Sequence, residues 1–283
     1  MTYRELAEGM AAALREAGRE SPERLVRDYL DDVGVKRGGA AIGADPLQLD
    51  AARVARDTER LCAGEPLQYV VGVAHFYGLR LAVGPGVLVP RPETEELVRW
   101  ILERHDGRAL HFADLCTGSG CIAVALAARR PSWSGVAVDV SARAISYAHV
   151  NLERAGVADR VDLLREDLLA SPSAVASGPA VDLIVSNPPY IPEQDWHRVD
   201  RAVADYEPAL ALRVPQADPL VFYRVVVELA ATRLRGGGWL YVESNDRYAT
   251  AVADLFASAG LSEVQGLADM QGRPRHVRAR MPD

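Results

Sequence analysis

The segment that decides the fold is ALHFADLCTGSGCIAVALAARR, residues 109–130. An apolar run typical of a strand leads into a loop with glycines at 118 and 120, and an alanine-rich stretch typical of a helix follows. The same order repeats downstream, with strand-like segments at 134–140, 160–167, 181–187, 238–244, 262–268 and 276–281 and helix-like segments at 142–156, 218–234 and 248–259. This alternation predicts an α/β fold with a doubly wound, seven-stranded, mostly parallel sheet and helices on both faces.

The first 72 residues have a helical pattern instead. Apolar residues recur at three- and four-residue steps through Tyr3, Leu6, Met10 and Leu14. Ser21-Pro22-Glu23 is typical of the start of a second helix, and Asp45-Pro46-Leu47-Gln48 of a third helix that ends near Gly64. We therefore expect residues 1–72 to form a small helical domain, either a structural cap or a module that docks a partner.

Between these two regions, residues 73–89 alternate apolar and polar positions around Gly84, Pro85 and Gly86, which predicts a β-hairpin linking the domains. A helix should follow from residue 90, with Glu93, Glu95 and Glu96 in its first turn, where negative charge is favourable. The predicted α/β domain then occupies residues 90–283.

Composition narrows the function classes. The net charge of −7 argues against a general nucleic-acid coat, which needs an excess of basic surface. The three cysteines form neither a disulfide framework nor a pair of zinc-type CxxC motifs, so we expect no metal. With no signal peptide and no apolar run of about 18 residues, we expect a cytoplasmic protein that does not enter a membrane.

The glycine loop predicts a nucleotide-like ligand, although a G-x-G pair alone is also typical of a tight turn between strand and helix. No Lys-Ser/Thr pair follows, which excludes a P-loop, and Ala123 replaces the third glycine of a dinucleotide site. About 20 residues further on, the next strand ends in Asp139, where a carboxylate accepts ribose hydroxyls. A nucleoside without a pyrophosphate fits this pattern, and adenosylmethionine is the obvious candidate.

The third strand ends in Glu166, Asp167 and Leu168. An acid here can accept from an adenine amino group while Leu168 covers the ring. A solvated strand end fits the sequence equally well.

The fourth strand ends in Asn187-Pro188-Pro189-Tyr190. Two prolines can simply terminate a strand, because proline has no N–H to donate. Beside a methyl donor, however, the corner has a chemical use: Asn187 supplies a side-chain acceptor, the prolines hold main-chain carbonyls outward, and Tyr190 offers a ring face. Such acceptors can hold both hydrogens of a planar –NH₂ group and align its nitrogen with the methyl.

These motifs together resemble a known family. LVPRPETEELV, DLCTGSGCIAVAL, AVDVS and VSNPPYIP, with GEPLQYVVGVAHFYGLRL before them and ADYEPALAL after them, resemble the glutamine N5-methyltransferases of bacterial peptide-chain release factors, the PrmC/HemK family. The resemblance implies a class I, Rossmann-like methyltransferase, with S-adenosyl-L-methionine as donor and a release factor as protein substrate. We expect the protein to be a monomer. It also implies that Asn187 to Tyr190 bind the glutamine of a Gly-Gly-Gln motif, with Asn187, Pro188 and Tyr190 as the catalytic residues.

The same resemblance implies a donor site, formed by Cys116, Thr117, Gly118, Ser119, Gly120, Asp139, Asp167, Leu168 and Asn187. It places Arg91 and Thr94 near the donor as well. One position departs from the family pattern, since glycine is usual where Cys116 stands. A second departure is VESNDRY, which lacks the glycine expected soon after Glu243.

Three other functions share parts of this pattern. A sister class of enzymes methylates a glutamine in a ribosomal protein with the same corner. An enzyme that methylates an exocyclic amine of a nucleic-acid base would need a recognition region rich in basic and aromatic residues, and the first 70 or so residues are mildly acidic instead. A binding module that has lost the chemistry would have no need for an intact glycine loop, ribose acid and NPPY corner.

Overall fold

The computed structural model describes residues 3–33, 50–105, 107–170 and 173–283. The chain divides into two compact units. The smaller comprises Met1–Val73, Val83–Pro85 and Asp200–Tyr206, and the larger comprises Ala74–Ala82, Gly86–Val199 and Glu207–Asp283. Each unit has its own hydrophobic core.

The smaller unit is helical. Its helices are α1 (Tyr3–Glu16), α2 (Pro22–Asp32), α3 (Ala51–Cys62), α4 (Leu67–Val71) and α9 (Arg201–Tyr206). Leu6, Met10 and Leu14 of α1 are buried against Tyr29 and Leu30 of α2, so the predicted apolar stripe faces the core. Helix α9 comes from a distant part of the chain, and the Tyr206 hydroxyl donates to the Ala63 carbonyl at 3.0 Å.

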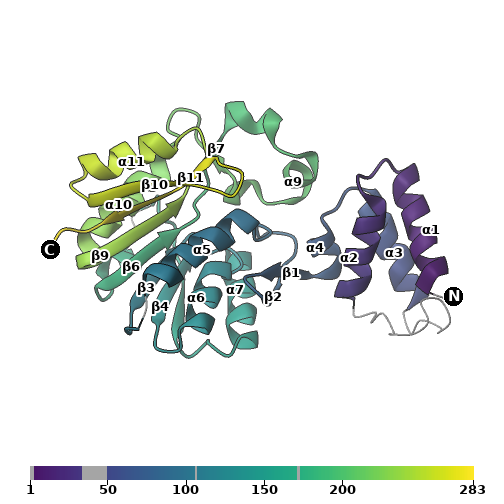
Figure 1. Ribbon diagram of the computed structural model, residues 1–283, viewed down its shortest axis with the longest axis horizontal. Coiled ribbons are helices and arrows are strands. Elements are labelled where there is room, and N and C mark those ends of the chain that lie inside the picture. The colour runs from purple at the N-terminus through teal and green to yellow at the C-terminus, as the bar shows by residue number, and fades with distance from the viewer. Residues whose placement is uncertain (1–2, 34–49, 106, 171–172) are drawn as a thin grey trace. The chain divides into compact units, whose positions relative to one another are not determined.

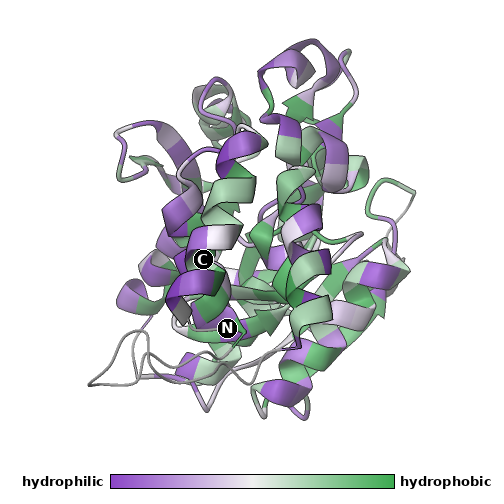
Figure 2. Cartoon of the chain, turned by 90° about the vertical axis from the view of Figure 1, so that its right-hand side faces the viewer, coloured by the Kyte–Doolittle hydropathy of each residue, from purple (hydrophilic) through white to green (hydrophobic). Residues whose placement is uncertain are grey.

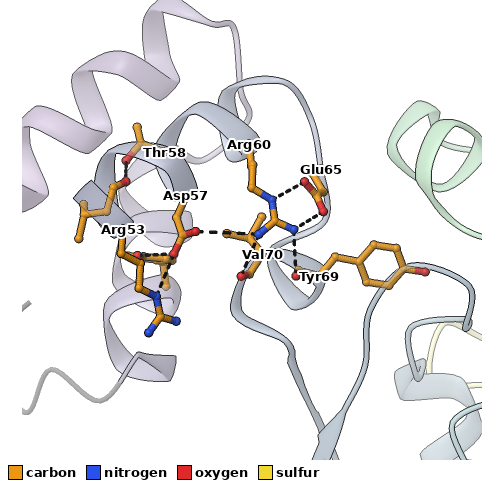
Figure 3. A network of polar contacts seen from close by, with 9 residues as sticks. Arg53, Asp57, Thr58, Arg60, Glu65, Tyr69 and Val70 are labelled. Carbon is orange, nitrogen blue, oxygen red and sulfur yellow. Dashed lines mark hydrogen bonds and ion pairs between the residues drawn. The ribbon is translucent and has the colours of Figure 1, made fainter. Parts of the chain in front are cut away.

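Arg60 holds α3 and α4 of this unit together (Figure 3). Its guanidinium makes two hydrogen bonds to Glu65, at 2.7 and 2.5 Å, and also donates to the main-chain carbonyls of Tyr69 and Val70. Two parallel bonds to one carboxylate fix the geometry of the pair. The turn between the two helices is therefore bound to the last turn of α3.

Two expected helix starts differ from the structure or lie outside it. Ser21 does precede α2, but it has a positive φ of 49° and its side chain makes no capping hydrogen bond, so the predicted cap is wrong. The capping box at residues 45–48 lies outside the described residues. Helix α3 begins at Ala51 behind the cap Asp50, which accepts from Ala52 N at 2.9 Å, and ends at Cys62, close to the predicted Gly64.

The larger unit contains the predicted sheet. Its strands are β3 (His111–Leu115), β4 (Ser134–Asp139), β5 (Val161–Arg165), β6 (Val181–Ser186), β9 (Leu234–Glu243), β10 (Ser262–Ala268) and β11 (Pro274–Arg280). They lie in the order β10-β11-β9-β6-β3-β4-β5, and β11 is antiparallel to both of its neighbours. The prediction of a doubly wound, seven-stranded, mostly parallel sheet is confirmed. Sequence patterns did not predict the short pair of β7 (Ile191–Pro192) and β8 (Arg213–Val214) or the 3-10 helices η1 (Glu193–Arg198) and η2 (Ala209–Ala211).

Helices cover both faces of this sheet (Figure 1). One face packs against α5 (Pro92–Arg104), α6 (Cys121–Arg129) and α7 (Ala142–Arg154), and the other against α8 (Ser173–Ser177), α10 (Val221–Arg233) and α11 (Ala249–Ser258). Successive strand residues point to opposite faces, so Phe112 joins the first cluster and Ala113 the second. In Figure 2 the stretches of strand visible at the centre are largely green, as expected when both faces are buried.

The β-hairpin is formed by β1 (Val73–Phe76) and β2 (Leu79–Ala82). Its turn is Tyr77-Gly78, with φ values of 49° and 74°, so the expected turn at residues 84–86 is wrong. Both values lie in the left-handed region that two-residue hairpin turns of type I′ require. The Asn151 side chain accepts from Ala82 N at 2.6 Å and donates to Ala82 O, which ties the hairpin to α7.

The sheet topology determines where a ligand can bind. Strand β3 lies between β4 and β6, so the strand order reverses at β3. In open parallel sheets ligands bind at the carboxyl ends of the strands beside this reversal. The glycine loop follows β3 and the NPPY corner follows β6, so both lie at that position. In the described part of the chain, no helix is long and apolar enough to cross a membrane.

Candidate active site

A cavity opens at the carboxyl ends of β3 to β6, and most of the predicted site residues line it. The predicted residues that line the cavity are Cys116, Thr117, Gly118, Ser119, Asp139, Asp167, Leu168, Asn187 and Pro189. Arg91 and Thr94 line it too. The segments that supply these side chains lie up to about 100 residues apart in the sequence, and the fold brings them to one edge of the sheet.

Three predicted residues do not line this cavity. Gly120 is the N-cap of α6, and a side chain there would approach Ala148 of α7 to 3.1 Å, so its smallness lets the two helices pack closely. Pro188 is buried beneath the corner. Tyr190 lines a neighbouring hollow together with Arg198, Arg247, Arg273 and Arg275.

The loop after β3 is held by hydrogen bonds to a buried acid. The Thr117 hydroxyl donates to Asp114 at 2.5 Å, and Ala123 N donates to the same carboxylate oxygen at 3.2 Å. Burial raises the pKa of Asp114 to about 7. The chain turns sharply here, with φ of 61° at Cys116 and 58° at Gly118. The positive φ at Cys116 explains in physical terms why glycine suits this position.

Asp139 connects the loop that follows β3 to the loop that follows β4. Its carboxylate accepts from Gly118 N at 2.8 Å and from Ser141 N at 2.9 Å. Burial raises its pKa, while these backbone hydrogen bonds lower it. Each carboxylate oxygen keeps a second lone pair, so Asp139 can still accept from a pair of hydroxyls in the cavity. The position fits the predicted ribose contact.

The end of β5 adds one apolar and one polar side chain. Leu168 is buried, with 5% of its surface exposed, and it forms part of the cavity wall. Asp167 lines the same cavity, and its carboxylate accepts from Leu169 N at 2.9 Å. An apolar wall beside a carboxylate suits a flat heteroaromatic ring that carries an amino group. The adenine contact stays a prediction.

At the corner, Asn187 begins a chain of hydrogen bonds that leads into the protein interior. Asn187 Nδ2 donates to Thr94 Oγ1 at 3.1 Å, and the Thr94 hydroxyl donates to Glu243 Oε2 at 2.7 Å. The Tyr190 hydroxyl donates to the other carboxylate oxygen of Glu243 at 3.2 Å. Burial raises the pKa of Tyr190, so this hydroxyl keeps its proton.

Sequence reasoning missed two acids at this site. Glu243, at the end of β9, is 1% exposed, and burial raises its pKa to about 7. Glu207 is also buried and pairs with Arg91 at 2.5 Å while accepting from Val89 N at 2.9 Å. Glu207 lies within ADYEPALAL, one of the motifs of the family resemblance, whereas Glu243 had no such signal beyond its place at a strand end.

This arrangement suits transfer of a group between two bound molecules. The glycine loop, Asp139 and the apolar side chain of Leu168 line the same cavity as Asn187. Within the described residues, no group of three His, Cys, Asp or Glu side chains is placed to hold a metal ion.

Comparison with known proteins agrees with this geometry. The family model described as "Methyltransferase small domain" matches residues 93–205. The release factor glutamine methyltransferase of Mycolicibacterium smegmatis is 39% identical over 279 residues, which span 96% of this chain and 95% of the relative. The chain belongs to the release factor glutamine methyltransferase family. The relative of the same name from Geobacter sulfurreducens is 38% identical over 288 residues, covering 99% of this chain and 97% of its own. The family resemblance of the sequence motifs is thus confirmed.

Solved structures of other methyltransferases have the same fold as this family member. The catalytic domain of human METTL16, solved in complex with an RNA hairpin, has a TM-score of 0.56 at 18% identity, covering 85% of this chain and 84% of that one. A methyltransferase from Pyrococcus furiosus has a TM-score of 0.54 at 17% identity, covering 82% of this chain and 98% of the other. At these identities the likeness shows a class I methyltransferase fold and nothing about the substrate.

Proposed function

We propose that this protein transfers a methyl group from S-adenosyl-L-methionine to the side-chain amide nitrogen of the glutamine in the Gly-Gly-Gln motif of a peptide-chain release factor. The observation that carries the proposal is that the glycine loop and Asn187 open onto one cavity. A donor on the loop and an amide on the corner would therefore meet without a further rearrangement of the sheet. The near full-length relatives are named for this activity.

The residues of the cavity fit the donor. The backbone of Cys116 to Ser119 would hold its amino acid part, Asp139 its ribose hydroxyls, and Asp167 with Leu168 its adenine. When bound, adenosylmethionine supplies a methyl group on a positively charged sulfur, and this charge makes the methyl carbon a strong electrophile. An apolar cavity wall excludes water, which strengthens each electrostatic contact to the charged donor.

The corner would prepare the target nitrogen. An amide nitrogen is a poor nucleophile, because its lone pair is delocalised into the carbonyl. Asn187 Oδ1 and a main-chain carbonyl of the proline pair would accept its two hydrogens and stabilise the positive charge that develops as the methyl arrives. The nitrogen–methyl bond would form as the methyl–sulfur bond breaks, which releases S-adenosylhomocysteine, and the methylated nitrogen would then lose one proton to water. Orientation and charge stabilisation suffice, so no general base is needed before transfer.

The rest of the substrate protein needs a separate docking surface, since the corner recognises only a small planar group. We assign this role to the helical residues 1–72. Residues 200–206, which follow the NPPY corner in the sequence, pack within the same helical unit. We expect the enzyme to act as a monomer in the cytoplasm, where translation terminates.

The proposal is tested by measuring which of several candidate substrates takes up a labelled methyl group. The purified protein is incubated with labelled adenosylmethionine and, in separate reactions, with a release factor, ribosomal protein and DNA. We expect label in the release factor alone. Label in ribosomal protein would assign the protein to the sister class, and label in DNA would contradict a protein substrate altogether.

A further inference from the structure

Glu243 is a buried carboxylate that lies behind the NPPY corner. It is the last residue of β9, and because Val242 is in register with Ser186 of β6, it lies level with Asn187. Between them stands Thr94, which is 2% exposed and belongs to the first turn of α5. Three elements far apart in the sequence thus contribute one continuous chain, Asn187–Thr94–Glu243.

The hydrogen bonds that join Asn187, Thr94 and Glu243 can have only one donor-to-acceptor direction. An ionised carboxylate only accepts hydrogen bonds, so the hydroxyl proton of Thr94 must point toward Glu243. Thr94 Oγ1 then has only lone pairs left for Asn187. The side of the Asn187 amide that faces Thr94 must therefore be the –NH₂ group, because its oxygen would meet another lone pair.

The opposite side of the same amide is left to face the cavity. With Nδ2 committed to Thr94, the Oδ1 atom of Asn187 is the one left for the cavity. An acceptor there can bind the N–H of a substrate amide, whereas a flipped side chain would present a donor to it. We infer that Glu243, acting through Thr94, fixes the orientation of the Asn187 amide and so serves as a positioning residue for methyl transfer; this rests on the function proposed above.

The second oxygen of the same carboxylate holds the other end of the corner. The Tyr190 hydroxyl donates to Glu243 Oε1 at 3.2 Å, which fixes the position of the phenol ring. On the far side, the Tyr223 hydroxyl of α10 donates to the Glu243 main-chain carbonyl at 3.1 Å, which anchors the strand end itself. One buried acid thus holds Tyr190 directly and Asn187 through Thr94.

The direction of these hydrogen bonds, from Asn187 through Thr94 to Glu243, depends on Glu243 being ionised. The titratable groups that face Glu243 are Arg275 and His276 of β11, Glu93 of α5, Tyr190, Tyr223 of α10 and Cys121 of α6. Burial raises the pKa of Glu243 to about 7, and the Arg275 charge lowers it. His276 stays neutral, since burial lowers its pKa to about 4. Below about pH 7 a protonated Glu243 could donate to Thr94 and release the amide, so methyl transfer should slow there.

The test compares Thr94→Val, which keeps the shape but removes the hydroxyl, with Thr94→Ser, which keeps the hydroxyl, and with Glu243→Gln. We expect Thr94→Val and Glu243→Gln each to lower kcat on a release factor about 10²-fold, the typical cost of a small misplacement at a reacting centre. Thr94→Ser should stay within a few-fold of the wild type. Donor affinity by calorimetry should be unchanged in Glu243→Gln, because Glu243 does not line the cavity, and the fall in rate below about pH 7 should vanish in the same variant. Thr94→Val and Glu243→Gln interrupt the same series of hydrogen bonds, so the double variant should be no slower than either single variant.

A readout independent of activity separates this inference from the proposed function. In ¹⁵N-labelled protein, the Asn187 side-chain NH₂ signals, assigned by their loss in Asn187→Ala, should exchange with solvent slowly in the wild type and much faster in Thr94→Val. Equal exchange rates in the two proteins would overturn the inference, even if the release factor is methylated. Slow exchange that Thr94→Val abolishes would support it, even if another protein proves to be the substrate. Wild-type kcat in Thr94→Val, beside an inactive Asn187→Ala, would also overturn it.

Discussion

Replacement of Asn187 by aspartate separates the two jobs of this side chain. The carboxylate keeps the size and the acceptor oxygens, so a residue that only accepted from the substrate would work nearly as well. In this structure, however, Nδ2 donates to Thr94 Oγ1, whose own proton is used on Glu243. The introduced carboxylate would place an oxygen against Thr94 Oγ1 with no proton between the two atoms.

The cost can be worked from the two distances. Asn187 Nδ2 lies 3.1 Å from Thr94 Oγ1, which lies 2.7 Å from Glu243 Oε2, so the two carboxylates would stand at most about 6 Å apart. At an effective dielectric constant of about 20 their repulsion is roughly 3 kcal/mol. The lost hydrogen bond adds about 1 kcal/mol. Together these make the wild-type orientation of the introduced side chain roughly 10³-fold less populated, so Asn187→Asp should be no faster than Asn187→Ala, for which we expect a loss of about 10²–10³ in rate.

Single-turnover methyl transfer to a release factor, with saturating donor, measures this cost directly. Circular dichroism serves as the control for folding and should match the wild type, and saturating donor removes any effect of the substitution on donor affinity. If Asn187→Asp keeps a rate within about tenfold of the wild type while Asn187→Ala does not, the acceptor role suffices and the reasoning from Thr94 and Glu243 is refuted.

Three further predictions follow from the donor site and the helical domain. Asp139→Ala should weaken adenosylmethionine binding by about 2–3 kcal/mol in calorimetry and leave the protein folded, and unchanged affinity would remove the ribose role. Cys116→Gly should raise the free energy of unfolding by up to about 1 kcal/mol in urea, because φ is 61° there, and a lower value would show that the side chain contributes more than the strained backbone costs. A chain beginning at Val73, once circular dichroism shows it folded, should bind the donor normally but methylate a release factor poorly, and equal turnover would reduce the helical domain to a cap.

The sheet could be predicted because each strand is a short apolar run with a clear end. Residues buried on both faces must be apolar at successive positions, and residues 183–185 of β6 show this directly. The ligand edge followed from the order of elements alone. The family motifs then supplied the residues of the cavity, which the structure brings together.

Contacts between distant segments could not be predicted in the same way. Thr94 and Glu243 are 149 residues apart, and a single acid after an apolar strand is also typical of a solvated strand end. The hairpin turn was misplaced because Gly84-Pro85-Gly86 is a stronger turn signal than Tyr77-Gly78, where a tyrosine adopts a φ that favours glycine. That residues 200–206 pack within the helical unit depends on tertiary packing, for which a short helix carries no pattern of its own.

The central claim is that the methyl group passes to one glutamine of a release factor, and locating the methyl group tests it most directly. A release factor is incubated with this protein and adenosylmethionine, digested, and sequenced by fragmentation mass spectrometry. We predict a single added methyl on the side-chain amide of the Gly-Gly-Gln glutamine, absent when the enzyme carries Asn187→Ala. A methyl group at any other residue, or an unmodified glutamine after complete donor turnover, would contradict the account.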